Sequence, residues 1–263
     1  MRTITSSFTT RSELTTHLLD VLGHDLIDRE GLPSPIIGSI PSEEELALHV
    51  RPSEYSRTRN FYDGAVTRLS PYIRHGLTKK PAIANLALRD YARSTCEKFL
   101  QELAWGEFWK VAADQLPFDL WTDIEPYKTG FEPDDYADEL PTDIANAKTP
   151  NACINHFIQD LTDTGYVHNH ARMYLAAYVV HFRKVKWQAG ARWFMTHLLD
   201  ADIASNNLSW QWVASTFSHK PYIFNLDNVD KYCGRQVNCA IEANPELAGS
   251  YEALTQRLFR GES

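Results

Sequence analysis

A long helical periodicity between Pro81 and Gln115 constrains the fold of this chain more than any other feature. One residue in every 3.6 falls on a common stripe, which is typical of an α-helix with one buried face. The stripe consists of Cys96, Leu100, Leu103, Glu107 and Val111. Glu107 is then a carboxylate among apolar neighbours, which indicates either a structural ion pair or a functional acid.

Other segments also favour helices, and none alternates strands with helices. Ser42 followed by Glu44 and Glu45 predicts a helix start. Helices are further predicted over residues 152–163 with Gly165 as the C-cap, over 169–185 and over 189–200. With its five prolines, segment 116–150 predicts a long solvated loop with at most one short helix. We therefore expect an all-α protein.

Composition places the chain among ordinary globular proteins, with 43% hydrophobic and 23% charged residues. No apolar run approaches the roughly 20 residues of a membrane helix, and the first ten residues lack the apolar core of a secretory signal. The sequence therefore predicts a cytoplasmic protein without a membrane partner. Residues 1–53 are expected to form an N-terminal helical extension, and residues 54–263 the main helical domain.

Nucleic-acid binding is not excluded by the net charge of −8, because the negative charge is concentrated in one segment. Without that segment, 25 acidic and 25 basic residues remain of the chain's 34 and 26. The segment contains Lys128 and nine acidic residues, namely Asp119, Asp123, Glu125, Glu132, Asp134, Asp135, Asp138, Glu139 and Asp143.

Metal binding is not expected from the cysteine and histidine pattern. Only Cys233 and Cys239 are close in sequence, and their C-x5-C spacing is poor for zinc. His156, His168 and His170 lie near one another, but no carboxylate or cysteine accompanies them at ligand spacing. Solvated or hydrogen-bonded histidines are the favoured interpretation.

Residues 198–216 combine polar and aromatic side chains unusually densely. Two carboxylates, two amides and two tryptophans fall within 13 residues: Asp200, Asp202, Asn206, Asn207, Trp210 and Trp212. In TGYVHNHARM, Asn169, Arg172 and Met173 share one face at a helix start and could line a pocket.

A second polar segment is VTRLSPYIRHG, in which Thr67, Arg68 and Ser70 precede Pro71. Proline suits the first turn of a helix, and hydroxyls, a guanidinium and free backbone N–H groups there favour an anion site. An ordinary capped helix is the alternative interpretation.

Together these motifs resemble the flavin-binding helical domain of the DNA photolyase and cryptochrome family. Five stretches occur in the family's order and at its approximate spacing, within residues 55–216: TRLSPYIRHG, FLQELAWGEFW, TGYVHNHARM, KWQAGARWFMTHLLDADIASNN and WQWVAST. The resemblance implies an α-helical bundle that holds FAD, and residues for the cofactor: Tyr55, Thr67, Arg68, Leu69, Ser70, Phe99, Glu102, Asn169, Arg172, Asp200, Asp202 and Asn206.

Within that set, the resemblance gives several residues individual roles. Thr67, Arg68, Leu69 and Ser70 would grip the diphosphate. Asp200 would pair with Arg172, and this ion pair would face the polar edge of the flavin together with Asp202. Asn206 would lie opposite flavin N5, where an amide can accept a hydrogen bond.

For the substrate, the resemblance implies a cyclobutane pyrimidine dimer in single-stranded or duplex DNA. Excited FADH⁻ would donate an electron to the dimer, which splits and returns the electron. The pocket of relatives that act on such dimers maps onto Glu102, Trp105, Asn169, Met173 and Trp212. The residues implied in catalysis and electron transfer are Glu102, Asn169, Asn206, Trp210 and Trp187. A cryptochrome-like sensor of blue light or redox state remains the alternative, as does a flavoprotein that photoreduces an unknown acceptor.

The sequence departs from the family pattern in its surroundings. An α/β antenna domain is not recognised before the motifs, so an antenna chromophore is not expected. No tryptophan stands near Asp134, where the distal electron donor of many relatives falls; Trp121, Tyr127, Tyr136 or an external reductant could take its place.

A further departure concerns contact with DNA. Gly106 and His170 stand where relatives have arginines, which predicts weaker duplex binding and a preference for single strands. Possible replacements are Arg74, Lys79, Lys80, Arg183, Lys184 and Lys186. The dimer type and the oligomeric state are left open, and so are the roles of residues 1–53 and 217–263.

Overall fold

The computed structural model describes residues 8–22, 34–36, 39–117 and 119–261. The chain divides into two compact units, residues 1–37 and 38–263. The first unit contains α1 (Arg11–Leu22), whose first turn is closed by Thr10 and Glu13. The Glu13 N–H donates to Thr10 Oγ1 at 3.2 Å, and the Thr10 N–H donates to Glu13 Oε2 at 3.3 Å. The domain boundary after residue 53 stays a prediction.

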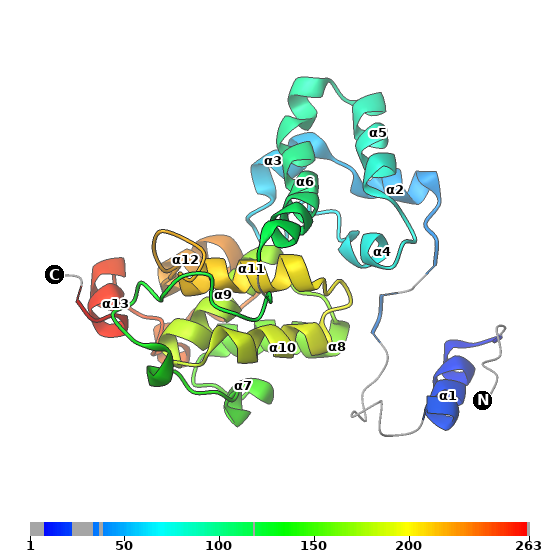
Figure 1. Cartoon of the computed structure of the whole chain (residues 1–263). Helices are drawn as coiled ribbons and strands as arrows, with labels where there is room; N and C mark the ends of the chain where they lie inside the picture. Colours follow the sequence, from blue (N-terminus) through cyan, green and yellow to red (C-terminus); the bar gives the residue numbers. More distant parts are fainter. Residues whose placement is uncertain (1–7, 23–33, 37–38, 118, 262–263) are drawn as a thin grey trace. The chain divides into compact units, whose positions relative to one another are not determined.

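The second unit is built from helices joined by loops (Figure 1). Its α-helices are α2 (Glu43–His49), α3 (Pro52–Thr58), α4 (Ser70–Arg74), α5 (Lys80–Asp90), α6 (Arg93–Gln115), α7 (Thr142–Ala145), α8 (Ala152–Thr164), α9 (Asn169–Ala177), α10 (Trp187–His197), α11 (Ile203–Ala214), α12 (Leu226–Cys233) and α13 (Tyr251–Leu258). Two 3₁₀ turns, η2 (Pro133–Asp135) and η4 (Ile241–Ala243), and the π-helical turn η3 (Tyr178–Phe182) complete it. Within the described ranges, β-structure is limited to one bridge between Ala137 and Val185. The all-α prediction is confirmed.

Helix boundaries follow local signals in the sequence. Ser42 caps α2 in a capping box with Glu45, as its hydroxyl predicts. Gly165 ends α8 in the left-handed conformation at φ 70°, which glycine adopts at little cost. The predicted helix between Pro81 and Gln115 is interrupted, because Tyr91 and Ala92 are extended and separate α5 from α6.

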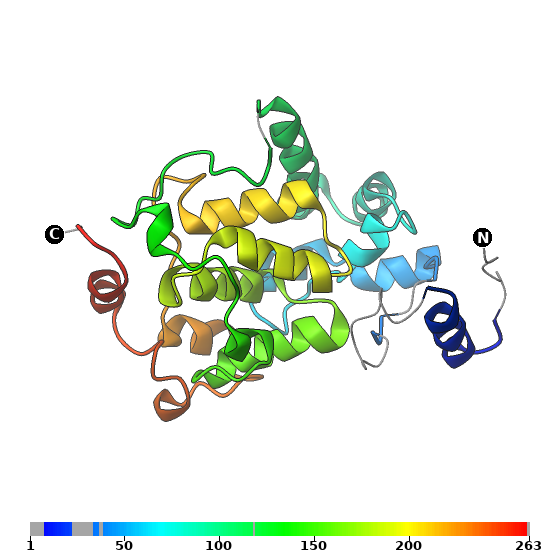
Figure 2. The same cartoon turned by 60° about the horizontal axis from the view of Figure 1, so that its bottom comes forward.

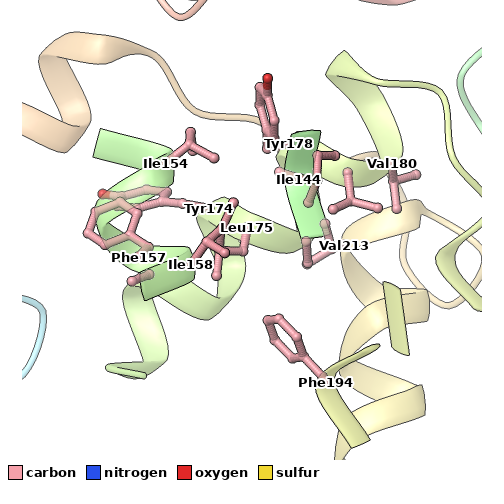
Figure 3. Packing of buried hydrophobic residues seen from close by; sticks show 14 of the residues in the cluster. Ile144, Ile154, Phe157, Ile158, Tyr174, Leu175, Tyr178, Val180, Phe194 and Val213 are labelled. Carbon is pink, nitrogen blue, oxygen red and sulfur yellow. The ribbon is translucent and has the colours of Figure 1, made fainter. Parts of the chain in front are cut away.

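The larger core lies among α8, α9, α10, α11 and α12 (Figure 2). Helices α9 and α10 both pack on α11, and α8 packs on α9. Figure 3 shows large apolar side chains of these helices and of α7 converging. Fully buried among them are Ile144, Ile154, Phe157, Ile158, Tyr174 and Leu175. Burial of each such side chain stabilises the folded state by roughly 1.5–3 kcal/mol. The core therefore holds the loops that connect its helices in place.

A smaller core joins α2, α4, α5 and the first half of α6, and α6 also packs on α11. Its buried residues are Leu46, Val50, Leu69, Ile83, Leu86, Ala87, Cys96 and Phe99. The second half of α6 leaves this core, so the predicted buried stripe is wrong beyond Leu103. Val111 is 61% exposed, and the Glu107 side chain, 59% exposed, pairs with Lys80 at 2.8 Å. Glu107 is therefore an exposed ion-pair residue.

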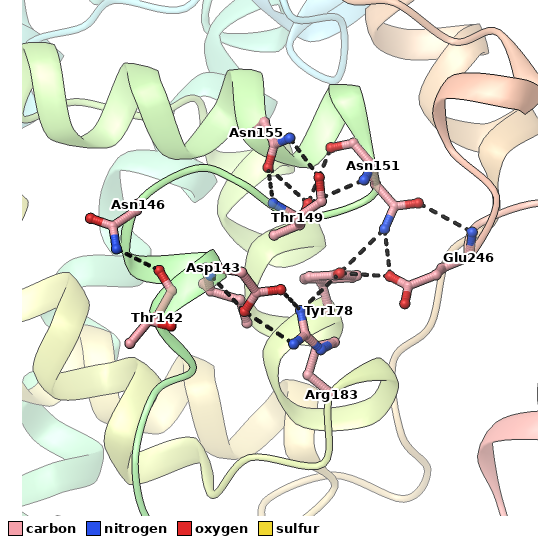
Figure 4. Close-up of polar contacts among 10 residues, drawn as sticks. Thr142, Asp143, Asn146, Thr149, Asn151, Asn155, Tyr178, Arg183 and Glu246 are labelled. Atoms are coloured by element: carbon pink, nitrogen blue, oxygen red, sulfur yellow. Dashed lines mark hydrogen bonds and ion pairs between the residues drawn. The ribbon is translucent and has the colours of Figure 1, made fainter.

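The acidic segment is largely irregular, as predicted, but it is not simply solvated. Tyr127, Thr129, Tyr136 and Ile144 are buried, because the segment packs against the larger core. Some of its charges are paired as well: Asp143 accepts from Arg183 at 2.7 Å and 3.1 Å (Figure 4). The predicted helix 169–185 ends earlier, in η3, just before Arg183.

A polar network fastens the C-terminal part of the chain to the same region. Buried Asn151 donates to Tyr178 Oη at 3.2 Å and to Glu246 Oε2 at 2.6 Å, and the Tyr178 hydroxyl donates to Glu246 Oε2 at 2.7 Å (Figure 4). Because buried polar groups are costly unless paired, this network fixes residue 246 beside α8 and η3. None of the described helices is long and apolar enough to cross a membrane.

Candidate functional site

A buried ion pair lies at the centre of the candidate site. Arg172 on α9 donates to Asp200, in the turn between α10 and α11, at 2.7 Å. Burial opposes ionisation of Asp200, whose side chain is 4% exposed, yet Arg172 and the Ser70 hydroxyl hold its pKa below the usual value. Asp200 Oδ1 is buried without a hydrogen-bond partner, so an acceptor is available to a ligand donor.

The TRLS segment is brought beside this ion pair. Arg74 Nε donates to the Ala201 carbonyl, and His75 Nε2 donates to the Leu199 carbonyl at 2.8 Å, so α4 is fastened to the turn that carries Asp200. Ser70 begins α4, with Pro71 in its first turn as predicted.

Within TRLS, the backbone of Arg68 is strained. Its φ of 55° is unusual for a residue with a side chain, and such outliers often mark ligand sites. The neighbouring Leu69 is buried and its N–H donates to Thr67 Oγ1 at 3.3 Å. The exposed Arg68 side chain is placed with its guanidinium 5.8 Å from the Tyr166 ring centroid.

Tyr166 connects the two cationic parts of the site. The Arg172 guanidinium lies 5.7 Å from the same ring centroid, so both arginines contact one aromatic residue. Tyr166 belongs to TGYVHN. The sequence did not predict its contact with the two arginines, because a tyrosine at this position is equally typical of a buried core residue.

Asn206 is oriented by a relay of amides. Its Nδ2 donates to the Ala191 carbonyl at 3.1 Å and to Asn207 Oδ1 at 3.0 Å, while Asn207 Nδ2 donates to the Leu120 carbonyl at 3.3 Å. Carbonyls only accept, so Leu120 fixes Asn207 and Asn207 fixes Asn206. Both N–H groups of Asn206 are engaged, which leaves its Oδ1 to accept from a ligand. Asp202 is engaged differently, since it caps α11 by accepting from the Ser205 N–H at 3.1 Å.

On α3 and α6, the candidate residues form a half-buried cluster. Tyr55 packs edge to face on Phe99, with ring centroids 5.2 Å apart. Glu102 accepts from Lys98 at 2.7 Å and lies 3.3 Å from Arg59. Burial and the nearby Glu102 carboxylate raise the pKa of Tyr55 to about 12, so its hydroxyl stays a donor.

The predicted substrate residues stand on three helices that contact one another through α11. Asn169 and Met173 lie one turn apart on α9, with Asn169 Nδ2 4.0 Å from Met173 Sδ. Trp105 on α6 is 47% exposed and Trp212 on α11 is 40% exposed. Trp105 also contacts the rings of Phe108 and Trp109, so the aromatic surface on α6 is contiguous, as at many ligand-binding surfaces.

The predicted electron-transfer tryptophans are buried around α10. The Trp210 ring packs so closely on Gly190 that an added Cβ would lie 2.2 Å from Cη2, and Phe194 meets the ring at 4.9 Å. Trp187, one helical turn from Gly190, is fully buried. Trp121 stacks on Trp187 with centroids 6.2 Å apart and planes 2° from parallel. Tyr127 and Tyr136, the other two candidates for the distal position, stack on each other at 4.5 Å.

Most cations proposed for DNA contact are engaged elsewhere. Lys80 pairs with Glu107, Lys186 with Asp138 at 2.6 Å, and Arg183 with Asp143. Lys184 lies 4.1 Å from the Phe131 ring centroid, and burial lowers its pKa to about 8. Arg74 is bound to the Ala201 carbonyl. These five side chains therefore interact with protein groups.

Lys79 differs from the other five. It is exposed at the start of α5 and makes no ion pair within the described part of the chain. Of the six, it is therefore the one whose exposed side chain is not held by another group in the described part of the chain.

The three histidines make protein contacts. His170 bonds the Asn60 carbonyl at 2.9 Å, His168 Nδ1 accepts from the His170 N–H at 3.1 Å, and His156 meets Tyr62 edge to face. Burial lowers the pKa of His168 to about 4, so it stays neutral. In the described part of the chain, no group of three metal-ligating side chains is arranged for a metal ion.

Comparisons with solved structures agree with this fold. An archaeal photolyase from Sulfolobus tokodaii, solved with two FAD molecules, superposes on 96% of this chain and 55% of its own with a TM-score of 0.63 and 24% identity. A class III photolyase from Agrobacterium tumefaciens covers 83% of this chain and 55% of its own, at TM-score 0.65 and 21% identity. A cryptochrome from Synechocystis reaches a TM-score of 0.66 at 18% identity over 85% of this chain and 53% of its own.

Sequence comparisons agree as well. Deoxyribodipyrimidine photo-lyase of Streptomyces griseus is 32% identical over 152 residues, which are 58% of this chain and 32% of that protein. The Synechococcus enzyme is 31% identical over 185 residues, 66% of this chain and 38% of that one. The chain thus spans about a third of the length of these relatives.

A family model matches more than half of the chain. It is described as the FAD binding domain of DNA photolyase, and it covers residues 99–242, from Phe99 on α6 to η4. The unpaired Asp200 oxygen and the free Asn206 oxygen are acceptors of the kind that a flavin's N–H groups need, so the residues present fit FAD. The chain belongs to the FAD-binding domain family of the DNA photolyases, and FAD is its cofactor.

Proposed function

We propose that this chain is a light-driven, FAD-dependent enzyme that splits cyclobutane pyrimidine dimers in DNA. One observation supports this most strongly: all five substrate positions carry the required residue, on helices that pack together. Their aromatic members, Trp105 and Trp212, expose 47% and 40% of their surface instead of packing into the core.

In this proposal the buried polar groups hold the flavin. Asp200 Oδ1 and Asn206 Oδ1 accept from its N–H groups, and Arg172 keeps Asp200 ionised. Arg68 and the Ser70 hydroxyl bind the diphosphate at the start of α4. When bound, the flavin supplies light absorption and the electron that opens the dimer.

The exposed face then receives the dimer after it is extruded from the DNA. Trp105 and Trp212 pack on the apolar faces of the two pyrimidines, and each such contact is worth roughly 1–3 kcal/mol. The Asn169 amide and the Glu102 carboxyl bond the carbonyl and imide edges. Glu102 must exchange at least one of its contacts with Lys98 and Arg59 to do so.

The direct test is repair in vitro. The full chain is loaded with FAD, reduced, and illuminated with blue light beside an oligonucleotide containing one thymine dimer. We expect the absorbance of intact thymine to return, with more than one dimer repaired per protein. If flavin is bound and reducible but neither single-stranded nor duplex dimer is repaired, the proposed activity is wrong.

Variants of two exposed aromatic residues locate the activity. Trp212→Ala should lower the affinity for dimer-containing DNA by about tenfold or more, from a loss of roughly 1–3 kcal/mol. Tyr91→Ala is the matched control, because Tyr91 is 37% exposed between α5 and α6 and lies outside the five positions. Equal losses in both variants would contradict the assignment of the pocket.

A sensor of blue light or redox state without repair activity is the second candidate. It is favoured by the engagement of Lys80, Arg183, Lys184 and Lys186, which reduces the charge available for DNA. The same observation supports a preference for single strands within the repair proposal, since duplex binding needs more phosphate contacts. Repair rates on matched single-stranded and duplex substrates test that preference.

A further inference from the structure

We propose that Asp123 is the proton acceptor of Trp187, so that oxidation of this buried tryptophan ends in a neutral radical held at Trp187. The inference rests on the proposed function only in requiring that electrons reach the flavin through Trp210 and Trp187. It assigns a role to the acidic segment, which the repair proposal leaves unused.

The geometry around Trp187 carries the inference. Its indole Nε1 donates to Asp123 Oδ1 at 2.6 Å, and the Gln188 side chain donates to the same oxygen at 2.9 Å. An oxygen that accepts two N–H groups carries no proton of its own, so it can receive one. The Trp187 side chain is fully buried, whereas Asp123 is half-buried and lies in a surface segment. A proton taken up by this carboxyl therefore has a route toward solvent that the indole itself lacks.

The neighbouring charges oppose any further movement of the electron hole. Trp121 is stacked on Trp187 and so is well placed to exchange an electron. The Arg192 guanidinium, however, lies 4.8 Å from the Trp121 ring centroid. A positive charge at that distance disfavours a second positive charge on the ring, while the Asp123 carboxylate favours one on Trp187. The hole is therefore more stable on Trp187 than on the outer tryptophan.

The step balances with one electron and one proton. After illumination the oxidised flavin is the one-electron acceptor, and Trp210 passes the deficit to Trp187, which loses one electron. The Trp187 Nε1–H bond then breaks and its proton bonds to Asp123 Oδ1, giving a neutral indolyl radical and a protonated carboxyl. Because the radical no longer carries charge, the return of the electron must wait for the proton.

Transient absorption on the FAD-loaded full chain tests the proposal, since cationic and neutral indole radicals absorb at different visible wavelengths. We expect the cationic signal to convert to the neutral one in a fast phase that slows in D₂O. Asp123→Asn keeps the shape of the side chain but cannot take a proton, so this phase should be lost. Glu125→Gln is the matched control, because Glu125 is an exposed acid of the same segment that pairs with Lys128. Survival of the fast phase in Asp123→Asn would overturn the proposal.

Two more measurements separate the parts of the inference. Trp121→Phe should leave the yield of neutral radical unchanged, and its loss would show that the hole rests on Trp121. In the flavin-free chain, ultraviolet resonance Raman spectra should report one strongly hydrogen-bonded indole N–H that weakens in Asp123→Ala and persists in Glu125→Gln. A chain that forms the neutral radical but repairs no dimer would refute the proposed function and leave this inference intact.

Discussion

The two faces of the candidate site differ in how completely the protein prepares them. On the cofactor side, Asp200 is nearly fully buried and ion-paired, and Asn206 is oriented through Asn207, which is itself 0% exposed. On the substrate side, Trp105 and Trp212 stand nearly half exposed. In the proposed function, the flavin would therefore meet preorganised side chains, whereas the substrate would meet side chains that can still adjust.

The largest expected effect comes from breaking the buried pair. Asp200→Ala leaves Arg172 without its partner, which should cost about 3–5 kcal/mol of unfolding free energy and abolish FAD retention. Glu54→Ala provides the control on an exposed pair, since Arg51 and Glu54 are about half exposed and should contribute less than about 1 kcal/mol. Urea unfolding and flavin content measure both effects; similar losses in the two variants would show that the cofactor side is not preorganised by this pair.

Acid should destabilise the fold, because two buried histidines must then be charged. Burial lowers the pKa of His168 and of His181 to about 4, so both are neutral in the folded chain. Their stabilising contribution is complete above the unfolded value near 6.5 and is lost as pH falls toward 4, by up to about 3 kcal/mol for each histidine. Urea midpoints at pH 7 and pH 5 measure this loss.

Variants at two histidines assign the acid effect. His181→Asn should reduce the pH dependence by roughly half, because one of the two buried groups no longer titrates. His168→Asn should reduce it in the same way, because burial lowers the pKa of His168 to about 4 as well. An unchanged pH dependence in His181→Asn would mean that other groups govern acid unfolding.

Sequence patterns predicted the parts of the fold that local chemistry decides. Ser42 and Gly165 mark helix ends because their own backbone and side chain satisfy the cap. The early end of α9 was missed, because AAYVVHF is apolar all round and periodicity cannot distinguish a π-helical turn from a continued α-helix. Glu107 was misplaced because the pattern shows a stripe but not how much of the helix the neighbouring elements cover.

The contacts of the candidate site also divide into those that sequence motifs predict and those that they do not. Arg172 and Asp200 could be paired from the family's motifs, and the structure contains that ion pair. Asp123 could not be connected with Trp187, because the contact joins residues 64 positions apart and depends on how an irregular segment folds back. Asp123 is one of nine acidic residues in that segment, and nothing in the neighbouring sequence indicates which of them contacts Trp187.

Replacing a helical glycine with alanine should show that the helix next to buried Trp210 is packed more tightly than the helix that carries exposed Trp105. Gly190→Ala places a Cβ 2.2 Å from Cη2 and 2.4 Å from Cζ3 of Trp210, so the ring or α10 must shift at a cost of about 1–3 kcal/mol. Gly106→Ala is the control in another helix, because its Cβ meets only the flexible end of Lys80 and alanine favours the helix by about 0.5–1 kcal/mol. Thermal unfolding should therefore move in opposite directions; destabilisation by both would show that α6 is as tightly packed as α10.

The smallest effect is expected from the exposed Lys79. Lys79→Gln should leave stability within about 0.5 kcal/mol, as is usual for surface substitutions, and lower the slope of log affinity against log salt by about 0.7–0.9 for a dimer-containing oligonucleotide. The reason is that one phosphate contact would be lost without disturbing a protein ion pair. Lys186→Gln is the control, because Lys186 is bound to Asp138 and should leave the slope unchanged. If Lys186→Gln lowers the slope as much as Lys79→Gln does, DNA also approaches the acidic segment, and ion pairing does not decide which lysines contact phosphate.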